Sequence, residues 1–134
     1  MLVEYVLDGS RIGSLEQFYD EIGRVLIPDS EWGRNLDAFD DILWGGFGTP
    51  EEGFIIRWSQ SALSKESLGY PETVRRLEVR LDCCHPSHCE SVARQLADAS
   101  QGVGPTVFDW LVEIIQRHGP DGDEGGNNVH LRLD

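Results

Sequence analysis

Three aspartates in one short stretch offer the clearest chemistry in this sequence. Asp37, Asp40 and Asp41 lie within five residues, and the only basic residue in positions 28–52 is Arg34. On a helix this spacing gathers the carboxylates on one side, where they repel each other. Carboxylates placed in this way accept charge-assisted hydrogen bonds from guanidinium and ammonium groups. The pattern therefore predicts a surface that receives its balancing positive charge from outside the chain.

The apolar residues of the same stretch indicate how it folds. Leu36, Phe39 and Leu43 recur at the spacing of one helix face, so a helix over about 36–44 would bury them opposite the aspartates. A plainer interpretation of the aspartates is a solvated acidic face that only aids solubility. Helix geometry by itself favours that plainer interpretation.

The residues on either side of the aspartates leave two interpretations open. Trp32 and Trp44 flank the acidic face, and either core packing or contact with a partner would explain them. Gly33 and Asn35 suit a turn that leads into the helix, because Asn is a good N-cap. Such a turn would be compatible with a role in binding.

Composition and charge limit the classes of partner. The 134 residues include 24 acidic and 11 basic ones, which gives a formal net charge of −13. Contacts to phosphate need Lys and Arg, so this balance argues against nucleic-acid binding. A strongly negative field instead raises the rate of association with a basic partner.

The sequence favours a soluble protein of the cytoplasm. It contains no run of 18 apolar residues, and its first residues are neither basic nor long enough for a signal peptide. Its three cysteines, an odd number within seven positions, do not form a disulfide framework. We therefore expect a reducing compartment and no membrane association.

Hydrophobic periodicity predicts a single α/β domain over residues 1–134. The predicted strands, given by short apolar or alternating runs, are 2–7, 54–58, a half-buried strand at 77–81, and 129–133. A capping box of Ser14 and Gln17 predicts a helix that begins after Ser14. Further helices are predicted from about 36, around Ala62, over about 92–99 and from about 107 to 118. Glycine-rich loops follow at 45–50 and 120–127. Helices between short strands favour a small, largely parallel sheet.

A cluster of cysteine and histidine residues suggests a zinc hypothesis. Positions 82–89 contain one aspartate, three cysteines and two histidines, and the candidate ligands are Cys84, His85, His88 and Cys89. Structural zinc sites usually take ligand pairs from two separated segments, and no second Cys/His pair occurs in this sequence. A packed or exposed thiol cluster is the favoured interpretation, with metal binding and redox sensing as alternatives. No cofactor is expected.

The sequence does not predict an enzyme. His118 or His130 could pair with Glu113 as acid and base, but no nucleophile motif accompanies them. The glycine-rich residues 45–48 lack the Lys-Ser/Thr ending of a phosphate-binding loop and follow a helix instead of a strand.

One motif and the order of elements together resemble a known family. The motif is Gly33-x-Asn35-Leu36-Asp37-Ala38-x-x-Asp41. Further matching residues are Val6-Leu7-Asp8-Gly9, Ile12, Ser14, Pro28, Leu43, the run Phe54 to Trp58, and the final helix, glycine and strand. In this order they resemble the barstar family of intracellular ribonuclease inhibitors. The resemblance covers about 1–69 and 105–134, and it leaves about 70–104 as an insertion with its own strand and helix.

The resemblance implies that the protein inhibits a ribonuclease by blocking its active site. In barstar-like proteins the second helix and the loop before it enter the active site of a basic secreted ribonuclease, where carboxylates replace RNA phosphates. Asp41 matches the family's central aspartate and Asp37 its neighbour one turn earlier. The residues expected to contact the partner are Glu31, Trp32, Gly33, Asn35, Asp37, Ala38, Asp40, Asp41 and Trp44. The chain would then be an antitoxin or immunity protein that binds one ribonuclease or RNase toxin, one to one.

Departures from the family pattern leave the target open. Glu31 stands where the family has an aromatic residue, and Asp40 where it has tryptophan. The family's contact glutamate on the last helix corresponds to Ile114. An alternative function is an adaptor or regulatory protein of the same fold that binds another basic protein, and the insertion at 70–104 is the feature that favours it.

Overall fold

The computed structural model describes residues 2–28, 31–44, 49–50, 52–120 and 128–134, so the loops 45–48 and 121–127 lie outside the described residues. The strands are β1 (Val3–Asp8), β2 (Phe54–Ser59) and β3 (Val129–Leu133). The α-helices are α1 (Leu15–Val25), α2 (Leu36–Trp44), α3 (Ser61–Ser67), α4 (Tyr70–Cys83), α5 (Pro86–Ser100) and α6 (Val107–Arg117). Among the residues described, no helix is both long and apolar enough to cross a membrane.

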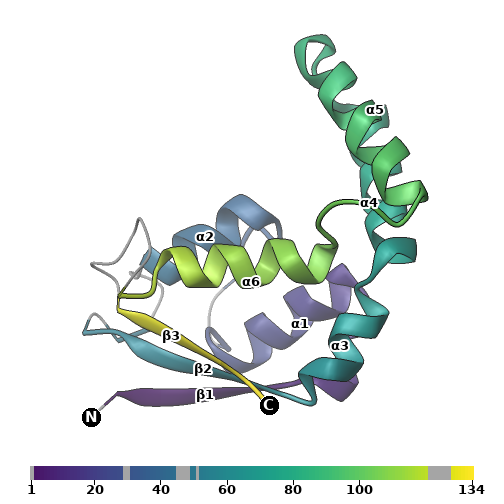
Figure 1. Cartoon of the computed structure of the whole chain (residues 1–134). Coiled ribbons are helices and arrows are strands. Elements are labelled where there is room, and N and C mark those ends of the chain that lie inside the picture. The colour runs from purple at the N-terminus through teal and green to yellow at the C-terminus, as the bar shows by residue number, and fades with distance from the viewer. Residues whose placement is uncertain (1, 29–30, 45–48, 51, 121–127) are drawn as a thin grey trace.

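The strands form one parallel sheet in the order β1-β2-β3, with helices over one face (Figure 1). In the central strand, Phe54 is level with Val3 of β1 and Val129 of β3. Parallel neighbours need crossover connections, and the helices between the strands supply them. The predicted α/β fold with a small parallel sheet is confirmed, as are its three strands and the short helix around Ala62.

Aromatic side chains join the helices to the sheet. Trp58 of β2 is fully buried, with ring centroids 5.4 Å from Phe18 of α1 and 5.1 Å from Phe108 of α6. Phe39 of α2 meets Phe18 edge to face at 5.1 Å. Such geometries add to the stabilisation from burial itself. The underside of α2 is therefore fixed in the core, and its other side is left to solvent.

The segment 70–104 is a helical hairpin, so the strand predicted at 77–81 is wrong. These residues belong to α4, in which Leu77 is buried while Val79 is 46% exposed. The alternation misled because Leu77 and Leu81 are also spaced i and i+4, which places them on one helix face. That face packs against α5 in a small core whose buried members are Leu77, Val92 and Ala99. The helix predicted around 92–99 is confirmed as part of α5.

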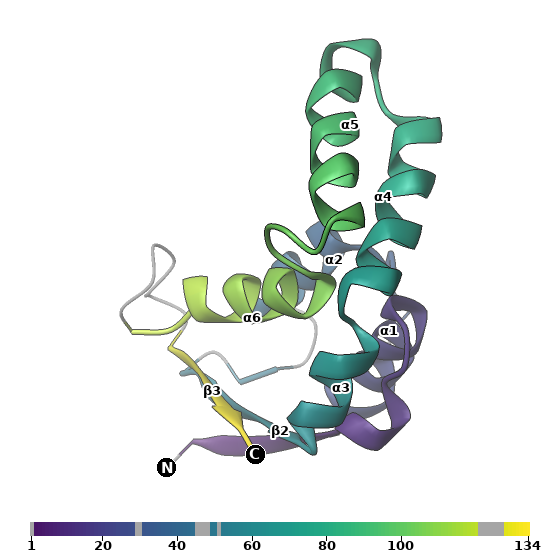
Figure 2. The same cartoon turned by 45° about the vertical axis from the view of Figure 1, so that its right-hand side comes forward.

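The hairpin leaves and rejoins the rest of the fold at one place. The Phe108 N–H donates to the carbonyl of Leu68 at 3.3 Å, and the Tyr70 hydroxyl donates to the carbonyl of Gly104 at 2.8 Å. Figure 2 shows α4 and α5 rising side by side from this root, away from the sheet. The hairpin thus adds a projection without separating α3 from α6.

A buried carboxylate anchors the base of the hairpin to α1. Glu72 is 7% exposed and accepts from the Leu15 N–H at 2.7 Å and from Arg75 at 2.6 and 2.8 Å. Arg75 also donates to Glu16 of α1 at 2.6 Å. A buried charge is tolerated only when it is paired and hydrogen-bonded in this way. The direction of α4 relative to α1 is therefore fixed at its base.

A second buried carboxylate makes stability depend on pH. Glu21 of α1 is 3% exposed and accepts from the Asp8 N–H at 2.7 Å and from Arg24 at 2.7 and 2.9 Å. Burial raises the pKa of Glu21, but the hydrogen bonds from Arg24 and Asp8 outweigh it and hold the pKa below its ordinary value of 4.5. A carboxyl group of this kind stabilises the fold above its unfolded pKa, and this contribution is lost as pH falls through the folded pKa.

Replacing Glu21 with glutamine is expected to lower the free energy of unfolding at neutral pH and to matter less in acid. The reason is that wild-type Glu21 itself becomes protonated as pH falls through its folded pKa, which its hydrogen bonds hold below the ordinary value. Urea unfolding of both proteins at about pH 7 and about pH 3 measures the difference. Glu66→Gln, at an exposed position on α3, is the control. An equal loss at both pH values would contradict the expectation.

Candidate functional site

A tight turn before α2 sets the start of the acidic helix. The Asn35 side-chain oxygen accepts from the Ala38 N–H at 2.7 Å, and its amide nitrogen donates to the Gly33 carbonyl at 3.3 Å. Arg34, between them, has a φ of 52°, in the left-handed region. A Cβ on Gly33 would come within 3.2 Å of the Ala38 Cβ. Glycine therefore lets the turn lie close against the helix, and the predicted turn is confirmed.

The carboxylates of α2 lie on its solvent side. Asp37 and Asp41 are exposed, and the Asp40 side chain keeps 30% of its exposure. Phe39 and Leu43 are buried on the opposite side, as the spacing predicts. Within the described residues, neither the Asp37 nor the Asp41 carboxylate takes part in a hydrogen bond or an ion pair. This face lowers the helix's own stability, because like charges at i and i+4 repel.

Asp40 differs from the other two because a buried histidine holds it. The Nε2 of His118 lies 2.7 Å from an Asp40 carboxylate oxygen, and His118 is 0% exposed. His118 ends α6, and its carbonyl accepts from the Val129 N–H at 2.9 Å. The Trp44 ring packs edge-on against the imidazole at 5.6 Å, and Trp44 remains 53% exposed. The contact fixes one carboxylate of the acidic face in place.

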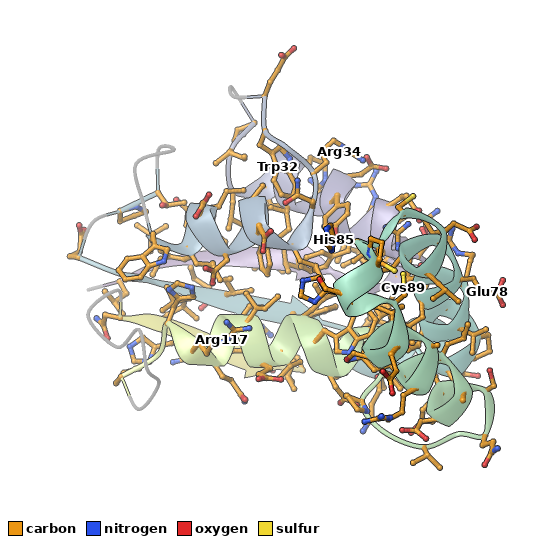
Figure 3. The ribbon with its side chains drawn as sticks, turned by 90° about the horizontal axis from the view of Figure 1, so that it is seen from above. Trp32, Arg34, Glu78, His85, Cys89 and Arg117 are labelled. Carbon is orange, nitrogen blue, oxygen red and sulfur yellow. The ribbon has the colours of Figure 1, made fainter. Side chains whose placement is uncertain are left out.

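The basic and aromatic residues before α2 turn toward α1. Arg34 pairs with Asp20 of α1 at 2.5 Å. The half-buried Trp32 meets Tyr19 edge to face at 5.5 Å, whereas Glu31 is exposed. Seen from above, Trp32 and Arg34 lie on one side of α2, and Arg117 lies on the other (Figure 3). The one basic residue of this stretch therefore pairs with α1 and not with the α2 carboxylates.

Two hollows join the acidic helix to the hairpin. One, of about 380 Å³, lies between the start of α2 and α4, and its lining includes Asn35, Asp37, Arg76, Val79, Arg80 and Cys83. The other, of about 290 Å³, has in its lining Asp37, Asp40, Arg80, Gln95, Glu113 and Arg117. Across the described chain, no arginine lies within 4 Å of an α2 carboxylate. The hairpin stands beside Asp37 and leaves its side chain exposed.

The cysteine and histidine residues lie at the far end of the hairpin. Cys83 is exposed, and Cys84 and Cys89 are partly buried. The His85 ring nitrogen accepts from the Ser87 N–H at 3.1 Å, so His85 caps the start of α5. His88 lies nearby, its ring centroid 6.3 Å from that of His85. Among the described residues, no three ligand-type side chains come together in the geometry of a metal site.

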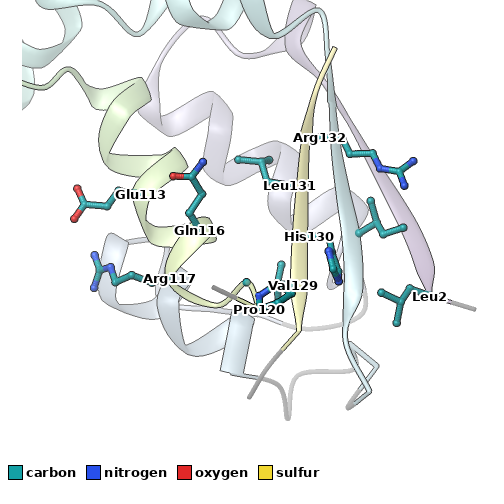
Figure 4. Close-up of a pocket in the computed structure, with 11 residues that line it drawn as sticks. Leu2, Glu113, Gln116, Arg117, Pro120, Val129, His130, Leu131 and Arg132 are labelled. Carbon is teal, nitrogen blue, oxygen red and sulfur yellow. The ribbon is translucent and has the colours of Figure 1, made fainter. Parts of the chain in front are cut away.

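A wider hollow, of about 730 Å³, lies along β3 and α6 (Figure 4). Its lining includes Leu2, Glu113, Arg117, His130 and Arg132. His130 lies 2.8 Å from the side-chain oxygen of Asn128, and His118 is engaged with Asp40. The two histidines therefore contact Asp40 and Asn128, and not Glu113, with which the sequence could have paired them.

A family model matches most of the chain. Its description is Barstar (barnase inhibitor), and the matched residues are 2–117, which run from β1 through the end of α6. The match includes α2, the turn before it and the hairpin. A search of curated proteins found no match.

Proposed function

The chain belongs to the barstar family, and on this premise we propose that it inhibits a basic ribonuclease of the barnase type. In the complex, α2 and the turn before it enter the enzyme's active site, where carboxylates replace the phosphates of RNA. The proposal includes a one-to-one complex, no catalytic activity of the inhibitor's own, and a role as a cytoplasmic antitoxin or immunity protein against a secreted or toxic ribonuclease.

The observation that supports this proposal is the exposure of Asp37 and Asp41 without a partner among the described residues. An active site that binds RNA presents Arg, Lys and His side chains, which form charge-assisted hydrogen bonds with carboxylates. Phe39 holds α2 in the core, so little conformational freedom is lost on binding. The net charge of −13 would steer the basic enzyme toward the inhibitor.

The neighbouring residues have distinct roles in the proposed interface. Asp41 and Asp37 reach into the cationic cleft, and Asp40 adds a carboxylate fixed by His118. Gly33 brings the backbone of the turn close to the enzyme. The remaining contacts are proposed for the edges of this surface, at Glu31, Trp32, Asn35, Ala38 and Trp44.

Titration of a purified barnase-type ribonuclease with this protein tests the proposal. RNA cleavage is expected to fall to background at one equivalent of inhibitor, and the Asp37→Ala/Asp41→Ala double variant is expected to need a large excess. Folding of the variant is checked by circular dichroism. Undiminished cleavage by every barnase-type enzyme tried, or equal inhibition by the double variant, would count against the proposal.

A second candidate function is an adaptor for a basic protein that is not a nuclease. The observation that favours it is the projecting hairpin of α4 and α5, since an added element can build a new contact surface. Capture of partners from native lysate separates the two functions. Recovery of a ribonuclease whose activity is blocked supports the inhibitor, and recovery of a basic protein without nuclease activity supports the adaptor.

A further inference from the structure

We propose that one face of α4, formed by Arg76, Val79, Arg80 and Cys83, is a second contact surface for the same ribonuclease. This inference rests on the proposed function. The face would lie against the rim of the enzyme's active-site cleft, at a place where the rim presents an acidic side chain next to an apolar one. Residues of the α4 face would then select among ribonucleases that share a similar cationic cleft.

The position of the hairpin makes contact with a bound enzyme hard to avoid. α4 and α5 project away from the sheet, on the side of the sheet where α2 lies (Figures 1 and 2). The 14 residues of α4 span about 21 Å at 1.5 Å per residue. A ribonuclease of about 100 residues has a radius of gyration near 13 Å. A body of that size seated on α2 would therefore lie beside the hairpin.

From Arg76 onward, α4 carries its basic and its acidic residues on different faces. Arg76, Val79, Arg80 and Cys83 are spaced i, i+3, i+4 and i+7, which makes them one stripe of the helix, and they line the hollow shared with α2. The acidic residues of the same turns, Glu78 and Asp82, are exposed and do not line that hollow. In a chain with 24 acidic residues, this stripe is basic and apolar.

The α4 face is continuous with the acidic face of α2. Asp37 lines both hollows between the two elements, and Arg80 lines both as well. A partner group that reaches Asp37 therefore lies next to Arg80. The two surfaces together present negative charge over α2 and positive charge over α4, so they fit an enzyme whose charge reverses at the edge of its cleft.

The arginines of the α4 face are held in place before any partner binds. The Arg80 guanidinium lies 5.5 Å from the centroid of the Trp110 ring, a cation–π geometry. Arg76 pairs with Glu16 of α1 at 2.9 Å. For Arg80, no carboxylate lies within ion-pair distance among the described residues. Arg80 is thus the positioned cation of this face, and the 46% exposed Val79 is its apolar contact.

The test uses the full-length protein and the barnase-type ribonuclease that it inhibits most tightly. Val79→Asp and Arg80→Glu are each expected to weaken inhibition about tenfold or more, because each places a negative charge against the acidic rim. The matched controls are Leu63→Asp, on α3 at 48% exposure, and Arg94→Glu, on α5 and outside both hollows. Controls are expected to stay within about twofold of wild type, in line with the small effect of isolated surface charges.

A direct measure of contact comes from Cys83, which is exposed in the free protein. Alkylation of Cys83 by iodoacetamide, followed by mass spectrometry, is expected to slow severalfold in the complex. If the α4 variants inhibit as well as their controls and Cys83 reacts at the same rate, the second contact surface is wrong, while loss of inhibition in the Asp37/Asp41 variant would still support the proposed function. If wild type inhibits no ribonuclease, both proposals fail together.

Discussion

Replacing Asp41 with alanine is expected to weaken the complex with the ribonuclease by about 2–5 kcal/mol. This is the usual cost of removing one partner of a buried charge pair, and charge pairs of the barnase–barstar complex are among those from which the range is drawn. The Asp41 carboxylate is exposed on α2 and has no partner among the described residues, so under the proposed function an arginine or lysine of the enzyme would be its counter-ion. Most of the loss reflects an arginine or lysine of the enzyme left buried and unpaired. The dissociation constant from inhibition titrations measures the effect.

The control for this change removes the same charge elsewhere. Glu66 is exposed on α3, and Glu66→Ala alters the net charge as Asp41→Ala does. If long-range attraction alone were responsible, the two variants would bind alike. We expect Glu66→Ala to change only the association rate and only slightly, so similar losses in both variants would contradict a specific role for Asp41.

The second large effect is expected from Phe39, which couples the fold to the acidic face. Phe39→Ala should lower the free energy of unfolding by about 3–5 kcal/mol, because it removes a fully buried ring and leaves a cavity. The lost ring packs edge to face on Phe18 at 5.1 Å. Inhibition should weaken as well, since α2 loses the contact that holds its carboxylates in position. Urea unfolding and inhibition titrations measure the two effects.

Leu63→Ala provides the comparison for Phe39. Leu63 is 48% exposed on α3, so its truncation should change stability by no more than about 0.5 kcal/mol. Phe39→Leu should fall between the two, because leucine fills part of the space. A Phe39→Ala protein as stable as wild type would show that α2 is not held by the core in the way the structure indicates.

Local signals in the sequence were sufficient for most helix starts and strands. Ser14 caps α1 by accepting from the Gln17 N–H at 3.2 Å, as predicted. The reciprocal half of the capping box is different, since the Gln17 side chain accepts from the Gly13 N–H at 2.6 Å. The acidic helix α2 could be predicted equally well, because its nine residues divide into an apolar face that is buried and an acidic face that is exposed.

The strand predicted at 77–81 failed because two periodicities coincide over a short window. Leu77, Val79 and Leu81 alternate as a strand would, yet the first and last of them also share a helix face. The deciding information lies outside the window. Pro71 at the first turn of α4 and the complementary apolar face of α5 favour the helix. A sequence window of five residues does not contain that information.

Contacts between distant residues account for what the sequence did not predict about the site. His118 and Asp40 are 78 positions apart, and neither carries a local signal for the other. One hint is that His118 follows Leu111, Ile114 and Ile115 at the spacing of the buried face of α6. The cation–π contact between Arg80 and Trp110 is hidden in the same way, since it depends on how the hairpin stands relative to α6.

The common root of the hairpin bears on how proteins of this fold diverge. Leu68 and Phe108 are already hydrogen-bonded neighbours, so a segment of almost any length can be spliced between them, and doubling its length adds only about 0.6 kcal/mol of closure entropy. Under the proposed function, blocking a catalytic cleft and discriminating between ribonucleases would then be inherited as separate traits. A lineage could then replace the hairpin by another segment and keep the same acidic helix α2.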